Sequence, residues 1–403
     1  MKKYILIILC CLTSFPLWSY NVNMIVEHYS VDQGLPNNTV NCTLKDRDGF
    51  IWFGTWYGLC CFDGVKFKTF NKQEHDSDVP PRKIQRIVED KNGYIWVKTI
   101  DRKLYVFNKV TECFHAVYDD MKNYSENIQV IKLQNTAEGD VLLLTKDKNL
   151  LLAGVDEKGQ VTIKILFDSR DEINKHDYTL KHHVLCETEE YISWIGTDYK
   201  VSAVHKGAEL ASRPADFITS KINSGDKDSF TSFFEDGRKV WVGDRAGIFY
   251  SIDVRTGLVN RYVLSEIKGA ISNLLVTPAG YVYLSVAGQG TYEYDLAERR
   301  LQKINTEMND AMVTHAFIDQ YDKIWFHENE KALIYYDPLN HTAKRFPFTM
   351  FGKITTLYSE DAGERGLFFL SPAGEAWLFD REHAEMVYIN KLKQLSNDRA
   401  NQQ

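Results

Sequence analysis

The sequence lacks an excess of basic residues, which limits the partners it can have. It carries a formal net charge of −7 at pH 7, from 48 lysines and arginines against 55 acidic residues. If the first 19 residues are removed, as argued below, the loss of Lys2 and Lys3 leaves 46 basic residues against 55 acidic ones, a charge of −9. Nucleic acid and anionic lipid are therefore not expected as partners.

Cysteine pairs at redox or metal-binding spacing are also absent. The cysteines outside the first 19 residues are odd in number and widely scattered, and they contain no C-x-x-C pair: Cys42, Cys60, Cys61, Cys113 and Cys186. Such a set is not a disulfide framework. We expect these cysteines to be small buried hydrophobic residues of strands.

The sequence has no apolar run long enough to span a membrane, and its one short apolar run lies at the N-terminus. Lys2 and Lys3 precede an apolar stretch over residues 5–12, which is the pattern of a secretory signal peptide. We predict a signal peptide over residues 1–19, cleaved near Ser19, and hence a periplasmic mature chain without a membrane span. Cys10 and Cys11 lie too early to favour a lipoprotein signal.

The sequence does contain an internal repeat. Residues 44–55 and 88–99 both run from an acidic turn through a glycine to Ile-Trp. Six weaker copies follow, and the equivalent positions are Trp52, Trp96, Leu142, Trp194, Trp241, Tyr283, Trp325 and Phe368. Their spacing of 42–52 residues fits one four-stranded sheet per repeat.

Each copy has the composition of a small antiparallel sheet. Asp48-Gly49 and Asn92-Gly93 supply the positive φ angles of a tight hairpin. The strand that follows, residues 50–55 in the first copy, is rich in β-branched and aromatic residues and is expected to be buried on both faces. Four strands per repeat with almost no helical periodicity predict an all-β protein, a β-propeller of four-stranded blades. We expect the aromatic residue of each second strand to pack one blade against the next.

The eight repeats allow two blade counts. Seven blades over residues 21–348, closed by an N-terminal strand at residues 24–29, would leave residues 349–390 as an extra repeat. An eight-bladed propeller is the alternative. In both arrangements the N-terminal strand pairs with the last blade, which removes exposed strand edges. Residues 391–403 are predicted to be a polar tail.

The repeat unit, Asp-x-x-Gly-x-Ile-Trp-x-Gly-Thr followed by Gly-Leu-x-x-Phe-Asp, resembles the two-component regulator propeller repeat. That repeat occurs in the periplasmic sensor regions of hybrid two-component histidine kinases of gut Bacteroidetes. The opening segment over residues 27–40 is similar to the start of those sensors, and the resemblance covers residues 24–390. It implies the sensory part of such a system, while the kinase, membrane helix and regulator parts of the family have no counterpart in this sequence.

The usual catalytic and metal-binding motifs are missing. Asp46 and Asp48 are similar to the start of a calcium loop, but the other ligands are absent and a hairpin turn is favoured. His176, His182 and His183 do not have a metal-binding spacing, and Gly-x-Ser-x-Gly does not occur. We predict no catalytic residue, metal or cofactor. A secreted propeller glycosidase or lyase is one alternative, and a protein-interaction scaffold that forms homodimers through the propeller or through further domains is another.

A ligand-binding surface is expected on the loops. In a propeller, the loops from second to third strands and those from fourth strands to the next blade open on the same face. Aromatic rings beside Asp, Asn and Arg suit sugar hydroxyls and charged groups. The candidate residues are Trp56, Tyr57, Arg82, Arg102, Tyr199, Asp244, Arg245, Gln289 and Asn329, with Asn37, Asp101, Asp198 and Glu328 beside them. We predict a sensor domain that binds an oligosaccharide without turning it over.

Overall fold

The computed structural model divides the chain into two compact units. The larger unit comprises residues 28–345, and the smaller unit comprises residues 346–403 together with residues 1–27. The structure describes residues 29–70, 81–121, 129–146, 149–167, 180–188, 190–196, 200–207, 217–221, 230–304, 313–328, 331–351, 358–361, 366–371 and 375–391.

The larger unit is a series of four-stranded antiparallel sheets, each formed by four consecutive strands in the order in which they occur in the chain. The strands are β1 (Val40–Lys45), β2 (Ile51–Thr55), β3 (Gly58–Phe62), β4 (Phe67–Phe70), β5 (Ile84–Glu89), β6 (Ile95–Thr99), β7 (Leu104–Asn108), β8 (Cys113–Ala116), β9 (Val130–Asn135), β10 (Val141–Thr145), β11 (Leu150–Val155), β12 (Val161–Phe167), β13 (Leu180–Glu187), β14 (Tyr191–Gly196), β15 (Lys200–His205), β16 (Phe217–Lys221), β17 (Phe230–Glu235), β18 (Lys239–Asp244), β19 (Ile248–Asp253), β20 (Val259–Val263), β21 (Ile271–Val276), β22 (Tyr281–Val286), β23 (Gly290–Asp295), β24 (Arg300–Lys303), β25 (Val313–Ile318), β26 (Ile324–Glu328), β27 (Ala332–Asp337) and β28 (Thr342–Pro347), the last of which ends in the smaller unit.

The described part of the smaller unit holds one further four-stranded sheet. Its strands are β29 (Tyr358–Asp361), β30 (Leu367–Leu370), β31 (Glu375–Asp380) and β32 (Glu385–Lys391). Helical segments are short: η1 (Val31–Gln33), α2 (Tyr118–Met121) and η4 (Phe348–Phe351). No described helix has the length and apolar character needed to cross a membrane.

One aspartate fixes the first hairpin of the first sheet. An Asp46 side-chain oxygen accepts hydrogen bonds from the N–H groups of Asp48 at 3.0 Å and Phe50 at 2.9 Å, while its other oxygen accepts the indole N–H of Trp52 at 2.8 Å. Gly49, with a φ of 93°, supplies the left-handed conformation of the turn. The carboxylate therefore shapes the turn and orients the tryptophan ring at the same time. We call this arrangement the Asp–Trp clamp.

The clamp recurs where the repeat is most regular. Asp90 binds the indole of Trp96 at 2.9 Å, Asp236 binds that of Trp241 at 2.7 Å, and Asp319 binds that of Trp325 at 3.3 Å. In two sheets without the tryptophan, a threonine takes the aspartate's place. The hydroxyls of Thr136 and Thr277 accept turn N–H groups at 3.0 and 3.2 Å, and the second strands there carry Leu142 and Tyr283. In the fourth sheet the threonine Thr188 stands at this position although the second strand carries Trp194, so the carboxylate is not a feature of every repeat with a tryptophan.

The clamped tryptophans fill the space between consecutive sheets. Trp52 of β2 lies 5.5 Å, centroid to centroid, from Phe107 of β7, and both are at most 3% exposed. Trp96 packs in one buried cluster with Leu143 and Leu151 of the third sheet. The prediction that the second-strand aromatic packs one blade against the next is confirmed for these sheets, and at about 25 cal/mol per Å² such burial is the main stabilising contribution.

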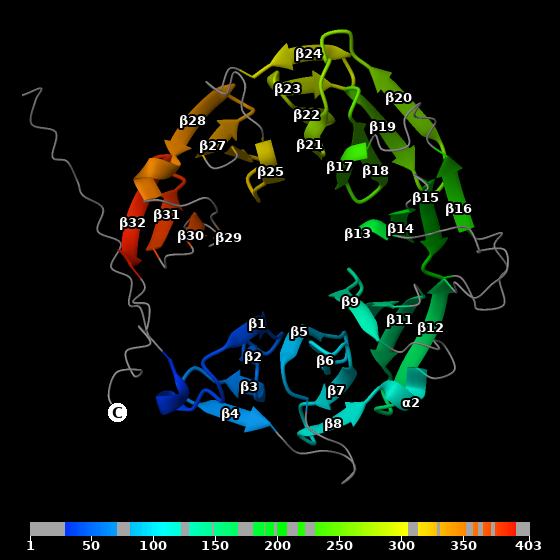
Figure 1. Cartoon of the computed structure of the whole chain (residues 1–403), viewed down its shortest axis with the longest axis vertical. Coiled ribbons are helices and arrows are strands. Elements are labelled where there is room, and N and C mark those ends of the chain that lie inside the picture. The colour runs from blue at the N-terminus through cyan, green and yellow to red at the C-terminus, as the bar shows by residue number, and fades with distance from the viewer. Residues whose placement is uncertain are drawn as a thin grey trace, which may run out of the picture. The chain divides into compact units, whose positions relative to one another are not determined.

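The first strands of neighbouring sheets lie against each other, as β1 does with β5, β17 with β21 and β21 with β25 (Figure 1). Each of these first strands has a bulge, and in β1 and β17 the side chain of the bulged residue contacts the next sheet. The Asn41 side chain donates to the Ile84 carbonyl at 2.7 Å, and the Thr231 hydroxyl donates to the Ile271 carbonyl at 2.7 Å. Neighbouring sheets are therefore joined by polar as well as apolar contacts.

The predicted fold class, an all-β propeller of four-stranded blades, is confirmed. The count of seven blades plus an extra repeat, and its eight-bladed alternative, stay predictions. The signal peptide over residues 1–19, most of the closing strand at residues 24–29 and the tail beyond Lys391 lie outside the described residues; Tyr29 is not in a strand. In the smaller unit, Phe368 is half-buried, and its neighbour Phe369 is the fully buried residue, because adjacent side chains of a strand point to opposite faces.

The predicted burial of the cysteines is confirmed for Cys60 and Cys61, whereas Cys42 and Cys113 are half-buried. Cys42, Cys60, Cys61 and Cys113 are free, and Cys60 is fully buried. Burial raises the pKa of the Cys60 thiol to about 12, which keeps it protonated and unreactive at neutral pH. The side chain of Cys186 lies outside the described part.

Replacing Asp90 with alanine is expected to destabilise the protein by about 3 kcal/mol, because buried turn N–H groups and the Trp96 indole would lose a charged acceptor. The measurement is urea unfolding followed by tryptophan fluorescence. Asp156→Ala is the matched control, since Asp156 accepts two turn N–H groups but no indole, and it should cost about 1 kcal/mol. Equal losses in the two variants would contradict the role of the clamp.

Candidate functional site

Trp56 and Tyr57 form the turn between β2 and β3. The Thr55 hydroxyl accepts a hydrogen bond from the Tyr57 N–H at 3.1 Å and donates one to the Gly58 carbonyl at 2.9 Å. Gly58 has a φ of 134°, a conformation that L side chains rarely adopt. The turn therefore holds two aromatic rings at the surface, with Trp56 40% and Tyr57 65% exposed.

The second sheet meets this turn through the segment that leads into β5. The Lys83 N–H donates to the Trp56 carbonyl at 2.9 Å, and the Lys83 ammonium lies 5.2 Å from the centre of the Trp56 ring. The N–H of Ile100, between β6 and β7, donates to the Lys83 carbonyl at 2.9 Å. The two kinds of loop that were predicted to share one face, from second to third strand and from fourth strand to the next blade, thus meet at one edge of the first two sheets. We define the aromatic rim as Trp56, Tyr57, Arg82, Lys83, Ile100 and Arg102.

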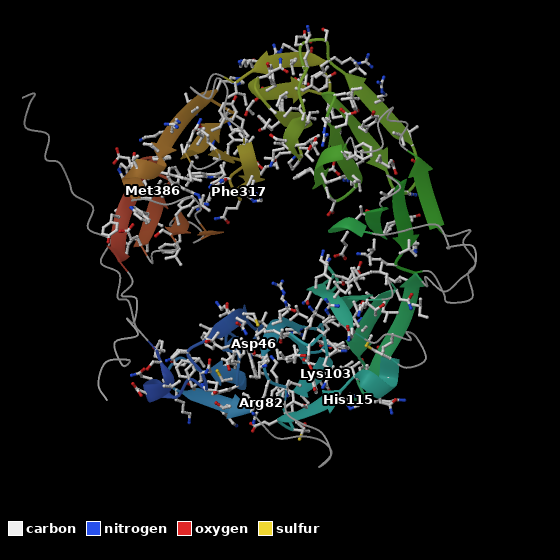
Figure 2. The ribbon with its side chains drawn as sticks, in the orientation of Figure 1. Asp46, Arg82, Lys103, His115, Phe317 and Met386 are labelled. Atoms are coloured by element: carbon white, nitrogen blue, oxygen red, sulfur yellow. The ribbon has the colours of Figure 1, made fainter. Side chains whose placement is uncertain are left out.

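Positive charge accompanies the aromatic rings. Arg82 and Arg102 are exposed, and Figure 2 shows Arg82 and Lys103 on this part of the ribbon. In the turn after β6, the Asp101 carboxylate accepts the Thr99 hydroxyl at 2.5 Å and lies 3.5 Å from the Lys103 ammonium. Aromatic rings flanked by guanidinium and ammonium groups can stack on a sugar ring and bind its hydroxyl or acidic groups.

Two predicted site residues are engaged within their own loops. Asp244 is 2% exposed, and its carboxylate accepts two backbone N–H groups of the β18–β19 turn at 2.8 and 2.9 Å. Burial raises the pKa of Asp244 above its ordinary value. The Gln289 amide accepts the Lys268 N–H at 2.7 Å and donates to the Glu266 carbonyl at 3.1 Å. These contacts stabilise the loops, and a ligand-binding role for either residue stays a prediction.

The remaining candidates are dispersed. Arg245 is exposed in the β18–β19 turn, Asn37 accepts the Thr39 N–H before β1, and Glu328 is buried against Arg345 at 2.9 Å. Tyr199, Asn329 and Asp198 lie outside the described residues. Of the predicted ligand-binding residues, Trp56 and Tyr57 share one turn, while Arg82 and Arg102 lie in the segments before β5 and after β6, where Lys83 bonds to that turn and Ile100 bonds to Lys83.

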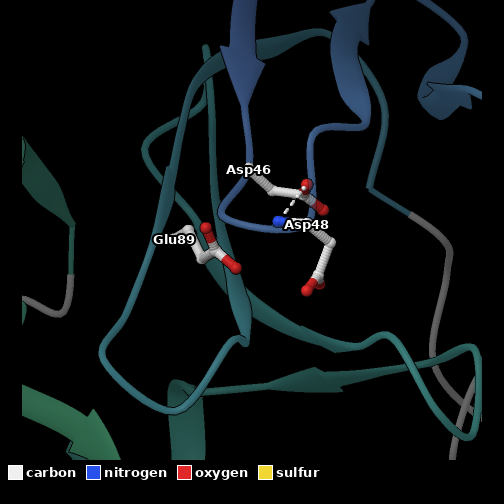
Figure 3. A group of neighbouring side chains, drawn as sticks. All are labelled: Asp46, Asp48 and Glu89. Atoms are coloured by element: carbon white, nitrogen blue, oxygen red, sulfur yellow. Dashed lines mark hydrogen bonds between the residues drawn. The ribbon is translucent and has the colours of Figure 1, made fainter.

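An acidic cluster lies at the other end of β2, beside the Asp46 turn. Carboxylate oxygens of Asp46, Asp48 and Glu89 lie within 4.8 Å of one another (Figure 3). The Lys109 ammonium bonds all three, at 2.9, 3.0 and 2.7 Å respectively. This lysine supplies the positive charge that a metal would otherwise supply. The interpretation of Asp46 and Asp48 as a hairpin turn is confirmed by the clamp, and the absence of a metal stays a prediction.

The electrostatics of this cluster favour an ionised Asp46. Burial opposes its ionisation, but hydrogen bonds from the Lys109 ammonium, the Trp52 indole and the Phe50 N–H outweigh burial, so the pKa of Asp46 is lower than its ordinary value. The same carboxylates raise the pKa of Lys109. The cluster joins the first and second sheets as an ion network.

Sequence reasoning missed Lys98, Gln85 and Arg86, which lie beside the aromatic rim on β5 and β6. The available signal was a departure from the repeat: the copy at residues 88–99 carries Lys98 where the copy at residues 44–55 carries a glycine.

Comparison with known families finds one match. Residues 34–57, which contain the first Asp–Trp clamp and the Trp56–Tyr57 turn, match the family described as two component regulator propeller. The resemblance of the repeat unit to that family is thereby confirmed for the first repeat. Comparison with curated proteins gives no match.

Comparison with solved structures gives propellers at low identity. The Dos1 propeller is 13% identical over 85% of this chain and 90% of that one, with a TM-score of 0.50. The extracellular domain of a hybrid two component system from B. thetaiotaomicron is 13% identical over 91% of this chain and 62% of that one, with a TM-score of 0.41. A second such domain from that organism is 15% identical over 91% and 55%, with a TM-score of 0.36. The chain thus spans less than two thirds of these two extracellular domains, and the similarity to the Dos1 propeller establishes the fold.

Calcium is not expected to stabilise the native protein, because the Lys109 ammonium occupies the acidic cluster. In the Lys109→Met variant the three carboxylates lose their counter-charge, and millimolar calcium should raise the Tm of that variant by several degrees. Thermal unfolding with and without calcium chloride measures this. A calcium-induced rise of equal size in the native protein would contradict the assignment.

Acid is expected to weaken the contact between the first two sheets. Because the pKa of Asp46 is lower in the folded than in the unfolded state, its stabilising effect is present above the unfolded value of about 4 and is lost as the pH falls through the folded value. Urea unfolding between pH 7 and pH 2.5 should show a smaller loss for Lys109→Met than for the native protein. The account fails if both proteins lose the same stability.

Proposed function

We propose that this chain is the exported, non-catalytic ligand-binding domain of a two-component sensor, and that it binds an oligosaccharide at the aromatic rim. The observation that carries the proposal is the pair of exposed rings, Trp56 and Tyr57, held by a fixed turn beside Lys83 and Arg102. Exposed aromatic rings on a rigid turn are a common sugar-binding arrangement, because they stack on apolar sugar faces at little entropic cost.

The signalling part of the proposal rests on the repeat. The match at residues 34–57 is to a repeat named for two-component regulators, and the hybrid-system domains to which the chain is similar are extracellular. Export agrees with the predicted signal peptide at residues 1–19. Binding of a ligand at the rim would then be signalled to parts outside these residues, directly or through a homodimer.

Trp56→Ala is expected to weaken oligosaccharide binding at least tenfold, because the stacking surface is lost, and Tyr57→Ala by a smaller factor. Isothermal titration calorimetry against a panel of plant and host oligosaccharides measures the affinity. Tyr388→Ala, which removes a ring that is 53% exposed in the smaller unit, is the matched control and should bind as the native chain does.

Two results would contradict the proposal. One is binding that is unaffected by Trp56→Ala. The other is release of new reducing ends from the bound oligosaccharide, which would favour a glycosidase or lyase instead.

A further inference from the structure

Lys98 is an unusual residue for its position in the repeat. The equivalent positions in the first and fifth sheets are Gly54 and Gly243, where a Cβ atom would come within 2.7 Å of the next sheet's isoleucine side chain. Lys98 is 6% exposed in β6, and its strand neighbours Ile95, Trp96 and Val97 are fully buried. The second sheet thus carries a long cationic side chain where the first and fifth sheets leave no room for one.

Gln85 departs from the repeat together with Lys98. As the bulged residue of β5 it is equivalent to Asn41 and Thr231, whose side chains donate to a carbonyl of the next sheet. The Gln85 side-chain oxygen instead accepts the Lys98 ammonium at 2.6 Å. This is the one hydrogen bond that the ammonium makes to a described residue. The contact that the bulged residues of β1 and β17 make to the next sheet is replaced here by a pair between the buried Lys98 and the exposed Gln85.

Further cations surround this pair. Arg86 is the cross-strand partner of Lys98, and Arg102 acts electrostatically on Lys98. Lys83 precedes Gln85 by two residues and lies over the Trp56 ring. We define the cation cluster as Lys83, Arg86, Lys98 and Arg102. None of the four forms an ion pair with a carboxylate of the described residues.

Other partly buried lysines of the chain do have acidic partners. Lys109 contacts three carboxylates, and Lys206 lies 2.6 Å from Glu187 and 3.0 Å from Glu138. Taking an ammonium out of water without a counter-charge is unfavourable. Burial, reinforced by Arg102, accordingly lowers the pKa of Lys98. A buried ammonium without a counter-charge, next to an exposed aromatic surface, is typical of a binding site in which the ligand supplies the missing negative charge.

We infer that the ligand of the aromatic rim is an acidic oligosaccharide, whose carboxylate or sulfate group binds the cation cluster at Lys98 and Gln85 while a sugar ring stacks on Trp56. This inference rests on the proposed function and adds the charge of the ligand to it. The chain as a whole carries a net negative charge, which disfavours an anionic ligand. Such a ligand is therefore favoured only where unpaired cations are grouped.

The test compares an acidic ligand with its neutral counterpart. Trigalacturonate supplies carboxylates, its fully methyl-esterified form has the same sugar backbone without charge, and a sulfated chondroitin disaccharide supplies a sulfate ester. Titration calorimetry on the whole purified chain in 50 mM salt is expected to give an affinity at least tenfold higher for an acidic ligand than for the neutral ester. The difference should shrink in 500 mM salt. Whether the carboxylate or the sulfate ligand binds more tightly identifies the source of the anion.

Lys98→Met is expected to remove most of the preference for acidic ligands, because it weakens binding of the acidic ligand far more than binding of the neutral ester. Lys158→Met, at an exposed turn lysine, is the matched control and should keep the preference. Because Lys98 is buried, Arg102→Gln provides a second variant at an exposed position, and circular dichroism checks the fold of each. Arg102→Gln should reduce the preference by a factor of three or more.

The inference is overturned if the neutral ester binds as tightly as the acidic ligands, or if Lys98→Met and Arg102→Gln both keep the preference. The first of these results would leave the proposed function standing, because a neutral sugar would still bind at Trp56. Failure of every oligosaccharide, acidic and neutral, to bind would contradict the proposed function and this inference with it.

Discussion

The hydrogen bonds that one buried carboxylate accepts from a hairpin turn and from an indole are the contact on which the regular sheets depend. Asp46 and Asp90 each close a turn and direct a tryptophan toward the next sheet. A ring placed in this way fills the space between two sheets, and its strand carries the next turn at the opposite end. The position of the rim, including Trp56, therefore follows from the clamp at the other end of the same strand.

Much of the fold could be predicted because it is periodic. Turn, glycine and Ile-Trp recur at an interval that only a repeated sheet explains, and side-chain alternation along strands then sets what is buried. The clamp itself could not be derived from the pattern, because an aspartate in a turn is usually solvated, whereas Asp90 is 1% exposed. Phe368 shows the same limit, because a faint repeat does not determine which of two adjacent phenylalanines faces the interior.

The site was predictable in part. Trp56 and Tyr57 could be assigned from their place in a loop, since large aromatic residues in a surface turn need a reason to be there. Asp244 and Gln289 have the same sequence context, but their side chains hydrogen-bond within or beside their own turns, and only coordinates show this. In the sequence Lys98 is an ordinary strand residue. Its significance comes from the glycine position that is crowded in the first and fifth sheets and from the altered role of Gln85.

The lysines at the two ends of the strands thus differ in their partners. At the clamp end, Lys109 is matched by acidic groups, whereas at the rim end Lys98 has a neutral partner beside exposed rings. The most direct test of this account is amide hydrogen exchange with and without an acidic oligosaccharide. We predict added protection at the amides of Tyr57, Lys83 and Arg102 and no change at the Asp46 and Asp90 turns. Protection confined to the clamp end, or to sheets remote from Trp56, would contradict it.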